Sequence, residues 1–352
     1  MSGGVDSSVA ALLLCEQGYQ VQGLFMKNWD EDGPDGTCLW EADVEDAMHV
    51  ADKLGIHLNT IDLAPAYWDR VFQHFLEDYR RGLTPNPDVL CNQMIKFSAF
   101  LEQAQSFGAS RIATGHYARI RSYANQYELL KGVDGNKEQS YFLCRLDQSR
   151  LQQSLFPVGE LEKPEVRALA KKAGFVTHDK KDSTGICFIG EQPFRDFLAR
   201  YIPKQPGEII TPEGKQIGTH EGVHFYTLGQ RQGLGIGGVK GADEAPWYVV
   251  AKDIGNNILV AAQGHDHPLL QSQSLEASDV HWIADQQPLL PLECAAKTRY
   301  RQPDQSCKVH ETGQDRITVT FESPQRAVTP GQFIVLYQED TCIGSAIIQS
   351  TS

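Results

Sequence analysis

Ser2-Gly3-Gly4-Val5-Asp6-Ser7-Ser8 is the stretch that decides the fold, and an apolar run from Val9 to Leu14 follows it directly. Glycine has no Cβ atom, so the two glycines let a bound phosphate approach the backbone N–H groups closely. The serines add hydroxyl donors, and the following helix directs its positive end at the anion. The Gly-Lys-Ser/Thr that ends a Walker A loop is absent. The stretch therefore predicts a phosphate-binding turn of another kind, against the alternative of a Gly-Ser turn that only caps a helix.

The composition is that of an ordinary globular protein, with a length that suits two or three domains. The chain has 352 residues, of which 41% are hydrophobic and 22% are charged. No apolar stretch reaches the roughly 18 residues of a membrane span, and no signal peptide precedes the phosphate turn, so a cytoplasmic location is expected. The net charge of −13 argues against non-specific binding of nucleic acid, but it leaves room for RNA on a local basic face.

The first half of the chain alternates helix-like and strand-like segments, which predicts an α/β fold with a doubly wound parallel sheet. Expected helices cover residues 8–17, 42–54, 65–79 and 92–107, and expected strands cover residues 21–26, 57–63 and 111–114. In such a fold, ligands bind at the carboxyl ends of the strands. After about residue 205, glycine and proline become more frequent and short alternating segments predict small β-domains or barrels. These segments are 208–210, 247–251, 258–261, 317–321 and 333–337.

The position of the phosphate turn is unusual, because a turn of this type normally follows a first β-strand and only Met1 precedes Ser2. A parallel strand buried on both faces is a core element. Its loss should cost many kcal/mol out of a total stability of about 5–15 kcal/mol. The expectation from the sequence is therefore a misassigned start codon, with the first strand encoded upstream.

Cysteines are the second informative feature. None of the eight forms a C-x-x-C pair, so zinc or thioredoxin-like chemistry has little support, and most are expected to be inert buried thiols. Cys91 follows a proline-stiffened loop with Asp88, at the expected start of the helix that contains Lys96, where the helix dipole stabilises a thiolate. The alternative is a buried thiol at the helix start, with Asp88 as the helix cap.

Cys187 lies between Lys180-Lys181 and Gly190 in a glycine-flanked loop, where the two lysines could lower the pKa of its thiol. A structural thiol packed beside Phe188 is the alternative. Two activatable cysteines on the scaffold of a phosphate-binding turn suggest sulfur transfer. A persulfide on one cysteine supplies sulfur, and the second cysteine takes part in the disulfide exchange that follows.

Ser-Gly-Gly-Xaa-Asp-Ser resembles the PP-loop of the ATP pyrophosphatases, which split ATP between the α and β phosphates and adenylate a substrate. Together with the cysteine motifs, the chain resembles the bacterial tRNA-specific 2-thiouridylase (MnmA) family along nearly its whole length, apart from the missing first strand. The matching runs are 23–29, 84–92, 113–117, 182–190, 226–231, 233–238 and 298–301.

The resemblance implies three domains: an adenylating, catalytic PP-loop domain over residues 1–195, a β-rich central domain over 196–270, and a C-terminal β-barrel that contacts tRNA over 271–352. It implies an enzyme that thiolates the wobble uridine of tRNA. ATP, with Mg²⁺, adenylates the 2-carbonyl oxygen, a cysteine persulfide supplies sulfur, and AMP leaves. No metal-binding residues are expected.

The resemblance also assigns residues. Cys187 matches the persulfide-carrying cysteine, Cys91 the other catalytic cysteine and Asp88 the acid/base residue, with a transient disulfide between the two cysteines. The ATP contacts match Ser2, Gly3, Gly4, Val5, Asp6, Ser7, Met26 and Gly115. The contacts to the target base match Asn86, Pro87 and Asp88. The tRNA contacts match His116, Lys137, Glu138, Gln139, Arg299, Tyr300 and Gln332. The implied partners are the tRNAs for Lys, Glu and Gln and a persulfide relay protein or cysteine desulfurase, and a monomer is expected.

Two other functions remain open. A PP-loop ligase would attack the adenylated carbonyl with an amine, but it would have no use for Cys91 and Cys187. A tRNA-binding protein with an incompetent nucleotide site would fit the missing strand. Among the RNA contacts, the Arg299-Tyr300-Arg301 stretch could be a solvated strand edge and His116 a structural histidine. Residues 29–32 are expected to form a solvated acidic loop rather than a metal site.

Overall fold

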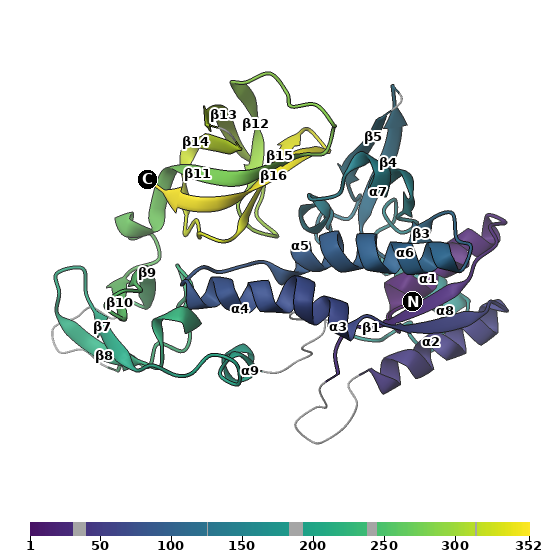
Figure 1. Ribbon diagram of the computed structural model, residues 1–352, viewed down its shortest axis with the longest axis horizontal. Helices are drawn as coiled ribbons and strands as arrows, with labels where there is room; N and C mark the ends of the chain where they lie inside the picture. Colours follow the sequence, from purple (N-terminus) through teal and green to yellow (C-terminus); the bar gives the residue numbers. More distant parts are fainter. Residues whose placement is uncertain (31–39, 125, 183–192, 238–244, 314) are drawn as a thin grey trace.

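The computed structural model describes residues 1–30, 40–124, 126–182, 193–237, 245–313 and 315–352. The described elements form three parts that follow one another along the chain (Figure 1). An α/β part comes first (purple to teal), a small β part follows (teal to green), and a β-barrel ends the chain (green to yellow). The predicted fold class is confirmed.

The α/β part contains most of the helices. Its helical segments are α1 (Val5–Glu16), α2 (Glu41–Leu54), α3 (Ala64–Tyr67), η1 (Trp68–Phe72), α4 (Gln73–Arg80), α5 (Pro87–Cys91), η2 (Asn92–Ala99), α6 (Phe100–Ser106), η3 (Ser140–Leu143), α7 (Gln148–Gln152) and α8 (Lys163–Lys172). Its strands are β1 (Gly23–Lys27), β2 (Leu58–Asp62), β3 (Ile112–Ala113), β4 (Ala118–Tyr123), β5 (Gln126–Lys131) and β6 (Ser154–Leu155). α1 forms because an extended Gly4 precedes an apolar run whose Val9 and Ala10 are buried.

Among the described residues of the α/β part, the parallel strands form two separate pairs, β1 with β2 and β3 with β6, rather than one continuous sheet. Met1 lies beside β1, because its amino nitrogen donates a hydrogen bond to the carbonyl oxygen of Leu24. Burial lowers the pKa of this amino group to about 5. Gly115, which follows β3, packs on the first turn of α1, so the carboxyl end of β3 lies near the phosphate turn.

The small β part has a four-stranded sheet with the order β8-β7-β10-β9. Its elements are α9 (Phe194–Leu198), β7 (Gly207–Ile210), β8 (Gln216–His220), η4 (Val223–Phe225), β9 (Trp247–Asp253) and β10 (Ile258–Gln263). Its core is continuous with that of the α/β part, since Phe225 and Tyr226 belong to the same buried cluster as Phe75 and Tyr79 of α4. This shared apolar core fixes the small β part against the helix that leads into residues 82–86.

The C-terminal part is a closed barrel, because the first strand β11 pairs with both β14 and the last strand β16. Its elements are η5 (Pro268–Leu270), β11 (Gln271–Trp282), β12 (Leu292–Lys297), β13 (Gln305–Gly313), β14 (Arg316–Arg326), β15 (Phe333–Gln338) and β16 (Thr341–Thr351). Alternating residues such as Ile317, Val319 and Phe321 are buried in its interior. The β4–β5 hairpin of the α/β part extends the barrel sheet through β16, where Leu130 pairs with Thr341. Within the described residues, no helix has the length and apolar character that crossing a membrane requires.

Candidate active site

The predicted phosphate turn lies at the N-terminus of α1, and Gly4 immediately precedes the helix. Gly3 has a φ of +69°, and a Cβ atom there would lie 2.3 Å from the carbonyl oxygen of Asp43, so the position requires glycine. Ser7 Oγ accepts from the N–H of Ser2 and donates to the carbonyl oxygen of Gly4, both at 3.1 Å, which closes the turn. The first N–H groups of α1 have no partner within the helix, and Gly4 has no side chain to cap them. They can therefore bind an anion.

Asp6, in the first turn of α1, is held by two residues distant in sequence. Lys163 Nζ donates to both carboxylate oxygens at 2.8 Å, and the Tyr117 hydroxyl donates to Oδ1 at 2.7 Å. The carboxylate therefore serves as an anchor that fixes the first turn of the helix against α8 and the start of β4. Neither partner was predicted from the sequence, because Lys163 lies 157 positions from Asp6 and belongs to no recognisable motif.

A cluster of cations lies beside this anchor. Asp182 accepts from Lys163 Nζ at 2.7 Å, from Arg167 Nη2 at 3.1 Å and from Lys137 Nζ. Burial alone would raise the pKa of Asp182, but the hydrogen bonds from Lys137 and Lys163 outweigh burial and lower it to about 2. Lys137, a predicted tRNA contact, is thus placed in the surroundings of the phosphate turn.

Gly115 and His116 follow β3 and connect the phosphate turn to the cysteine helix. A Cβ atom on Gly115 would lie 2.7 Å from Asp6 Cβ and 2.8 Å from Ser7 N, so the backbone here packs directly on the first turn of α1. Nδ1 of His116 shares a hydrogen bond with Thr114 Oγ1 at 2.8 Å. The centroid of its ring lies 5.9 Å from that of Phe97 on η2. Burial and the charge of Lys96 lower the pKa of His116 well below its usual value, so its ring is neutral at physiological pH.

Met26, the remaining predicted ATP contact, lies on β1 one residue before its carboxyl end and packs against the large apolar cluster beneath it. That position agrees with binding at the ends of parallel strands. The contacts of Gly115 therefore place the end of β3 against the phosphate turn, and the nucleotide contacts of Gly115 and Met26 both stay predictions.

The helix that carries Asp88 and Cys91 begins earlier in the chain than predicted. The helix predicted over residues 92–107 is present as η2 and α6, but its predicted start is wrong, because α5 starts at Pro87 and continues directly into η2. Asn86 is the cap, with its side chain accepting from Val89 N at 3.3 Å, and proline at the first helical position needs no N–H partner. Cys91 is consequently in the second turn and fully buried, where the dipole of the helix acts weakly on its thiol.

The barrel holds this loop from one side. Gln332 Nε2 donates to the carbonyl oxygens of Thr84 at 2.7 Å and Pro85 at 3.3 Å, and its Oε1 lies 3.5 Å from Asn86 Nδ2. The N–H of Thr84 donates to Pro330 O at 3.0 Å. Gly331 permits this approach, since its φ is +91° and a Cβ atom would lie 2.9 Å from Thr84 N. The structure thus brings the predicted tRNA contact Gln332 together with the loop predicted to meet the target base.

The small β part holds the same loop from the other side. Lys252 Nζ donates to the carbonyl oxygens of Gly82 and, at 3.0 Å, Tyr226. Thr84 Oγ1 and Thr227 Oγ1 lie 3.3 Å apart. Burial lowers the pKa of Lys252 to about 8. All three parts of the molecule therefore converge on residues 82–86, which lead into and include the first predicted target-base contact, Asn86.

The side chains of Glu138 and Gln139 accept hydrogen bonds from other parts of the protein. The Glu138 carboxylate is buried and accepts from Lys297 Nζ of the barrel at 3.1 Å and from Ser140 N at 2.5 Å. Gln139 Oε1 accepts from the N–H of Tyr117 at 3.0 Å. The tRNA contacts predicted for both stay predictions, with both side chains engaged inside the protein.

Arg299 and Tyr300 lie in the turn between β12 and β13, and not on a strand edge. Arg299 is exposed, whereas the Tyr300 ring packs on Phe142 with centroids 4.4 Å apart. The guanidinium of Arg301 lies 5.6 Å from the Tyr300 ring centroid. An exposed arginine beside a tyrosine is suited to phosphate and base contacts.

Cys187 lies outside the described residues, so its predicted approach to Cys91 is not tested. Asp182, the described residue that precedes this segment, is anchored beside the phosphate turn as given above. Lys180, expected to lower the pKa of Cys187, pairs with Asp43 at 2.7 Å and Asp46 at 2.5 Å on α2, and its effect on Cys187 stays a prediction. The described residues contain no group of three or more His, Cys, Asp or Glu arranged to hold a metal ion.

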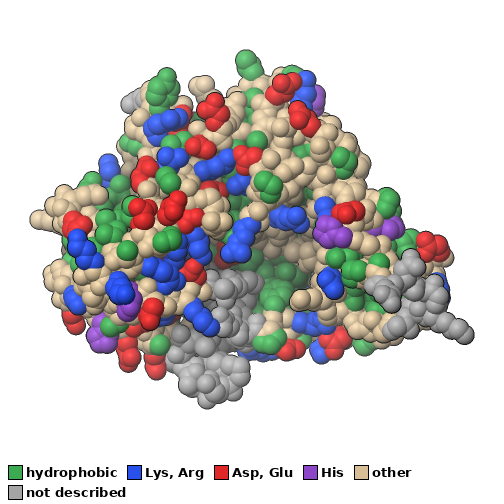
Figure 2. Space-filling view, turned by 180° about the vertical axis from the view of Figure 1, so that it is seen from behind, with side chains coloured by type: hydrophobic (Ala, Val, Ile, Leu, Met, Phe, Trp, Pro, Cys, Tyr) green, Lys and Arg blue, Asp and Glu red, His purple; other side chains and the backbone are tan. Residues whose placement is uncertain are grey.

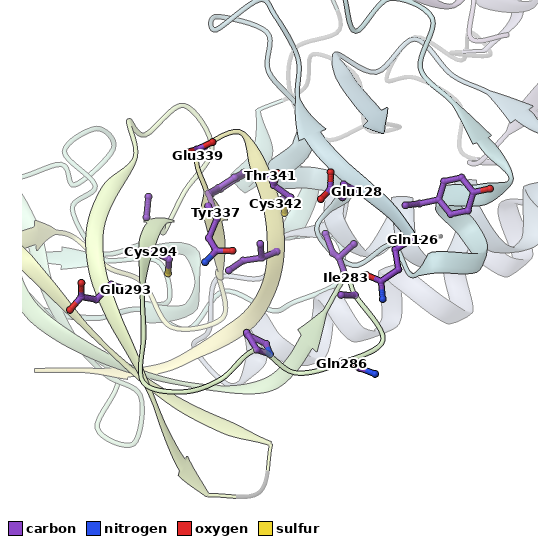
Figure 3. A pocket seen from close by; sticks show the side chains of 16 residues that line it. Gln126, Glu128, Ile283, Gln286, Glu293, Cys294, Tyr337, Glu339, Thr341 and Cys342 are labelled. Atoms are coloured by element: carbon purple, nitrogen blue, oxygen red, sulfur yellow. The ribbon is translucent and has the colours of Figure 1, made fainter. Parts of the chain in front are cut away.

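The surface of the molecule has two concave features, a hollow and a pocket. Figure 2 shows a hollow near the middle of one face, with Lys and Arg side chains gathered around it, although the chain is acidic overall. A separate pocket of about 690 Å³ lies between the β4–β5 hairpin and the barrel strands β12, β15 and β16 (Figure 3). Among the residues that line it are Glu128, Ile283, Cys294 and Tyr337. None of the predicted site residues lines this pocket.

The fold and the turn define a nucleotide-binding protein of the PP-loop class with two β domains appended. Family models described as "tRNA methyl transferase HUP domain", "tRNA methyl transferase PRC-barrel domain" and "Aminomethyltransferase beta-barrel domain" match residues 1–191, 195–263 and 272–348. A protein named tRNA-specific 2-thiouridylase MnmA from Alcanivorax borkumensis is 56% identical over 100% of this chain and 96% of its own length.

Relatives of the same name from Methylococcus capsulatus and Klebsiella pneumoniae are 57% and 58% identical, over 100% and 99% of this chain and 95% of each relative. The chain belongs to the tRNA-specific 2-thiouridylase MnmA family.

Proposed function

We propose that this chain is an ATP-dependent sulfurtransferase that replaces the 2-carbonyl oxygen of the wobble uridine in tRNA with sulfur. The observation that carries the proposal is the packing of Gly115 on the first turn of α1. The next residue, His116, lies against Phe97 on the helical segment that continues from Asp88 and Cys91. These contacts connect the anion-binding turn to that segment. The printed names of the relatives support the same reaction.

In the first half of the reaction, the phosphates of ATP bind the N–H groups that begin α1. Lys137, Lys163 and Arg167 add positive charge beside them. Mg²⁺ brought in with ATP would supply further positive charge for the phosphates, beside the cations of these three residues. The 2-carbonyl oxygen of uridine attacks the α-phosphorus, pyrophosphate departs, and the base is left adenylated on that oxygen.

In the second half, the terminal sulfur of a persulfide on Cys187 attacks C2 of the base. The C2–O bond breaks and AMP leaves, so the base is joined to Cys187 through two sulfur atoms. The Cys91 thiolate then attacks the Cys187 sulfur, which releases the thiolated base and leaves a Cys91–Cys187 disulfide. A thiol reductant restores both thiols, and Asp88 exchanges the protons. Because Cys91 is fully buried, its surroundings have to open during turnover.

The wider assignments follow the same proposal. The substrates are the tRNAs for Lys, Glu and Gln, and sulfur arrives from a persulfide relay protein or cysteine desulfurase. The enzyme acts as a monomer in the cytoplasm. Residues 1–195 carry the chemistry, residues 196–270 form the central domain, and residues 271–352 contact tRNA. Gln332, which contacts Thr84, and the exposed Arg299, whose neighbour Tyr300 packs on Phe142 of the α/β part, support the last assignment.

The decisive experiment supplies the purified protein with ATP, tRNA and a persulfide donor, and measures AMP formation and the nucleoside mass. We expect exchange of oxygen for sulfur, and a loss of thiolation of about a hundredfold or more in Cys91→Ser and in Cys187→Ser. Cys15→Ser, at the far end of α1, is the matched control and should retain activity.

Other outcomes distinguish the alternatives. Full AMP-linked product in Cys187→Ser would favour an amide-forming ligase, and a methyl group on the product would favour the chemistry named in the family descriptions. Calorimetric titration that detects tRNA binding without ATP binding would favour a tRNA-binding protein with an incompetent nucleotide site.

A further inference from the structure

Two cysteines of the barrel lie directly opposite each other on adjacent strands. Cys294 on β12 pairs with Cys307 on β13, and their Sγ atoms are 3.8 Å apart. Residues paired in this way in antiparallel strands have Cα atoms about 4.5 or 5.5 Å apart. Both separations lie within the roughly 4.4–6.8 Å that disulfides span. A bond between these sulfur atoms therefore requires little movement of the backbone.

The two thiols differ in access and in acidity. Cys294 lines the pocket of about 690 Å³ between the barrel and the β4–β5 hairpin, whereas Cys307 is 5% exposed (Figure 3). The hydrogen bond between them lowers the pKa of the Cys294 thiol and, together with burial, raises the pKa of the Cys307 thiol. A thiol that lines a pocket, beside a buried partner thiol, is the arrangement in which the first attacks a disulfide and the second resolves it.

Cys15, Cys144 and Cys342 differ from Cys294, although Cys342 also lines the pocket. Cys144 and Cys342 are fully buried, and burial raises the pKa of both. Burial also raises the pKa of the Cys15 thiol, which has intermediate exposure on α1. The volume of the pocket beside Cys294 falls within the range of about 300–1,000 Å³ that is typical of small-molecule sites.

We propose that Cys294 and Cys307 form a redox-active dithiol site, which takes low-molecular-weight disulfides such as oxidised glutathione from this pocket. The Cys294 thiolate attacks one sulfur of the small disulfide, forms a mixed disulfide and releases one thiolate. The Cys307 thiolate then attacks Cys294 Sγ, forms the internal disulfide and releases the second thiolate. In total, two protein thiols are oxidised, and one small disulfide is reduced to two thiols.

The position of the pair gives the reaction a structural consequence. Cys294 and Cys307 lie 13 positions apart and flank the turn that contains Arg299 and Tyr300, so the new bond closes the base of this turn. Oxidation should therefore restrain the turn and stabilise the barrel, because a crosslink removes freedom from the unfolded chain. Any effect on tRNA rests on the proposed function, whereas the crosslink does not.

The test treats the native, full-length protein with oxidised glutathione, blocks remaining thiols by alkylation and maps disulfides by mass spectrometry without reduction. We expect both Cys294 and Cys307 to disappear from the alkylated pool and a peptide joined through the two residues to appear. Tm should rise in the oxidised protein and return on reduction. Stable glutathione on Cys294 without the crosslink, or an unmodified Cys294, would overturn the proposal.

Single substitutions separate the two roles. Cys307→Ser should accumulate the mixed disulfide on Cys294, and Cys294→Ser should leave Cys307 unmodified. Cys15→Ser is the matched control and should form the crosslink at the native rate. If Cys307 reacts fully in Cys294→Ser, the assignment of Cys294 as the attacking thiol is wrong. Should a variant not fold, the time course in the unsubstituted protein decides, because the mixed disulfide must precede the crosslink.

Discussion

Two glycines decide the geometry of the phosphate turn, and for different reasons. Gly3 combines a positive φ with close contact to the backbone of Asp43, so both strain and crowding exclude a side chain. At Gly115, crowding alone excludes a side chain, since an added Cβ atom would meet Asp6 and Ser7. The sequence indicated the role of Gly3 through its motif, but the physical need for Gly115 follows only from its packing on α1.

Gly115→Ala should weaken ATP binding by about tenfold or more, because overpacking of this kind typically costs about 1–3 kcal/mol and displaces the first turn of α1. Calorimetric titration with a non-hydrolysable ATP analogue measures the effect. Gly135→Ala is the matched control, because no atom lies within 4 Å of the added Cβ there. Equal ATP affinity in both variants would show that Gly115 does not shape the nucleotide site.

At the scale of elements, the connection between α4 and α5 is the structure on which the three parts converge. Gln332 and Pro330 hold residues 84–86 from the barrel, and Lys252 and Thr227 hold residues 82–84 from the small β part. This arrangement gives the small β part a role in positioning Asp88 and Cys91. It also explains why the helix starts at Pro87, since a held loop and an Asn86 cap define its first turn.

Lys252→Met should lower the rate of thiolation by about tenfold while leaving ATP affinity unchanged, because it frees the loop from β9 without touching α1. The exposed Lys308→Met is the control, since a surface pair such as Lys308–Glu293 contributes about 0–1 kcal/mol. Steady-state kinetics with tRNA and titration with ATP measure the two quantities. A parallel loss of both would mean that Lys252 acts through general stability.

The lowered pKa of Lys252 also predicts that the stability of the protein depends on pH. Its pKa falls from 10.5 to about 8 on folding, so the unfolded chain binds the proton more tightly. The contribution of Lys252 to stability is therefore fully present above about pH 10.5 and is lost as the pH falls through about 8. Denaturant unfolding of the unsubstituted protein and Lys252→Met should show a difference in free energy of unfolding that favours lysine increasingly between pH 8 and pH 10. A constant difference would contradict the assigned protonation.

At the scale of the whole molecule, the net charge of −13 conceals a local basic face. Lys and Arg side chains gather around the hollow in Figure 2, which is the distribution that an acidic protein needs in order to bind tRNA. Affinity for tRNA should then fall steeply with salt, because each neutralised phosphate releases counterions.

Arg299→Ala should weaken tRNA binding and reduce the slope of log K against log salt by about 0.7–0.9, the value of one phosphate contact. Arg316→Ala is the matched control, because Arg316 lies beyond the opposite end of the nine-residue strand β13, roughly 30 Å away along the barrel. Binding measured at several salt concentrations distinguishes the two. An unchanged slope in Arg299→Ala would remove this residue from the tRNA interface.

The sequence by itself determined the phosphate turn, the helices and strands of the α/β part as far as β3, and the presence of a β-rich second half. These features depend on backbone freedom, capping and hydrophobic periodicity within a few residues, so local patterns are sufficient to predict them. The start of α5 was missed, because the Asn86 cap and Pro87 were interpreted as a loop.

Only the tertiary structure decided which distant segments meet. The β4–β5 hairpin joins the barrel sheet, Lys163 reaches Asp6, three parts of the molecule hold residues 82–86, and Cys294 faces Cys307. Each of these contacts depends on strand register or on the packing of one core against another. No short stretch of sequence carries that information, because such pairings are stabilised only when the whole chain has folded.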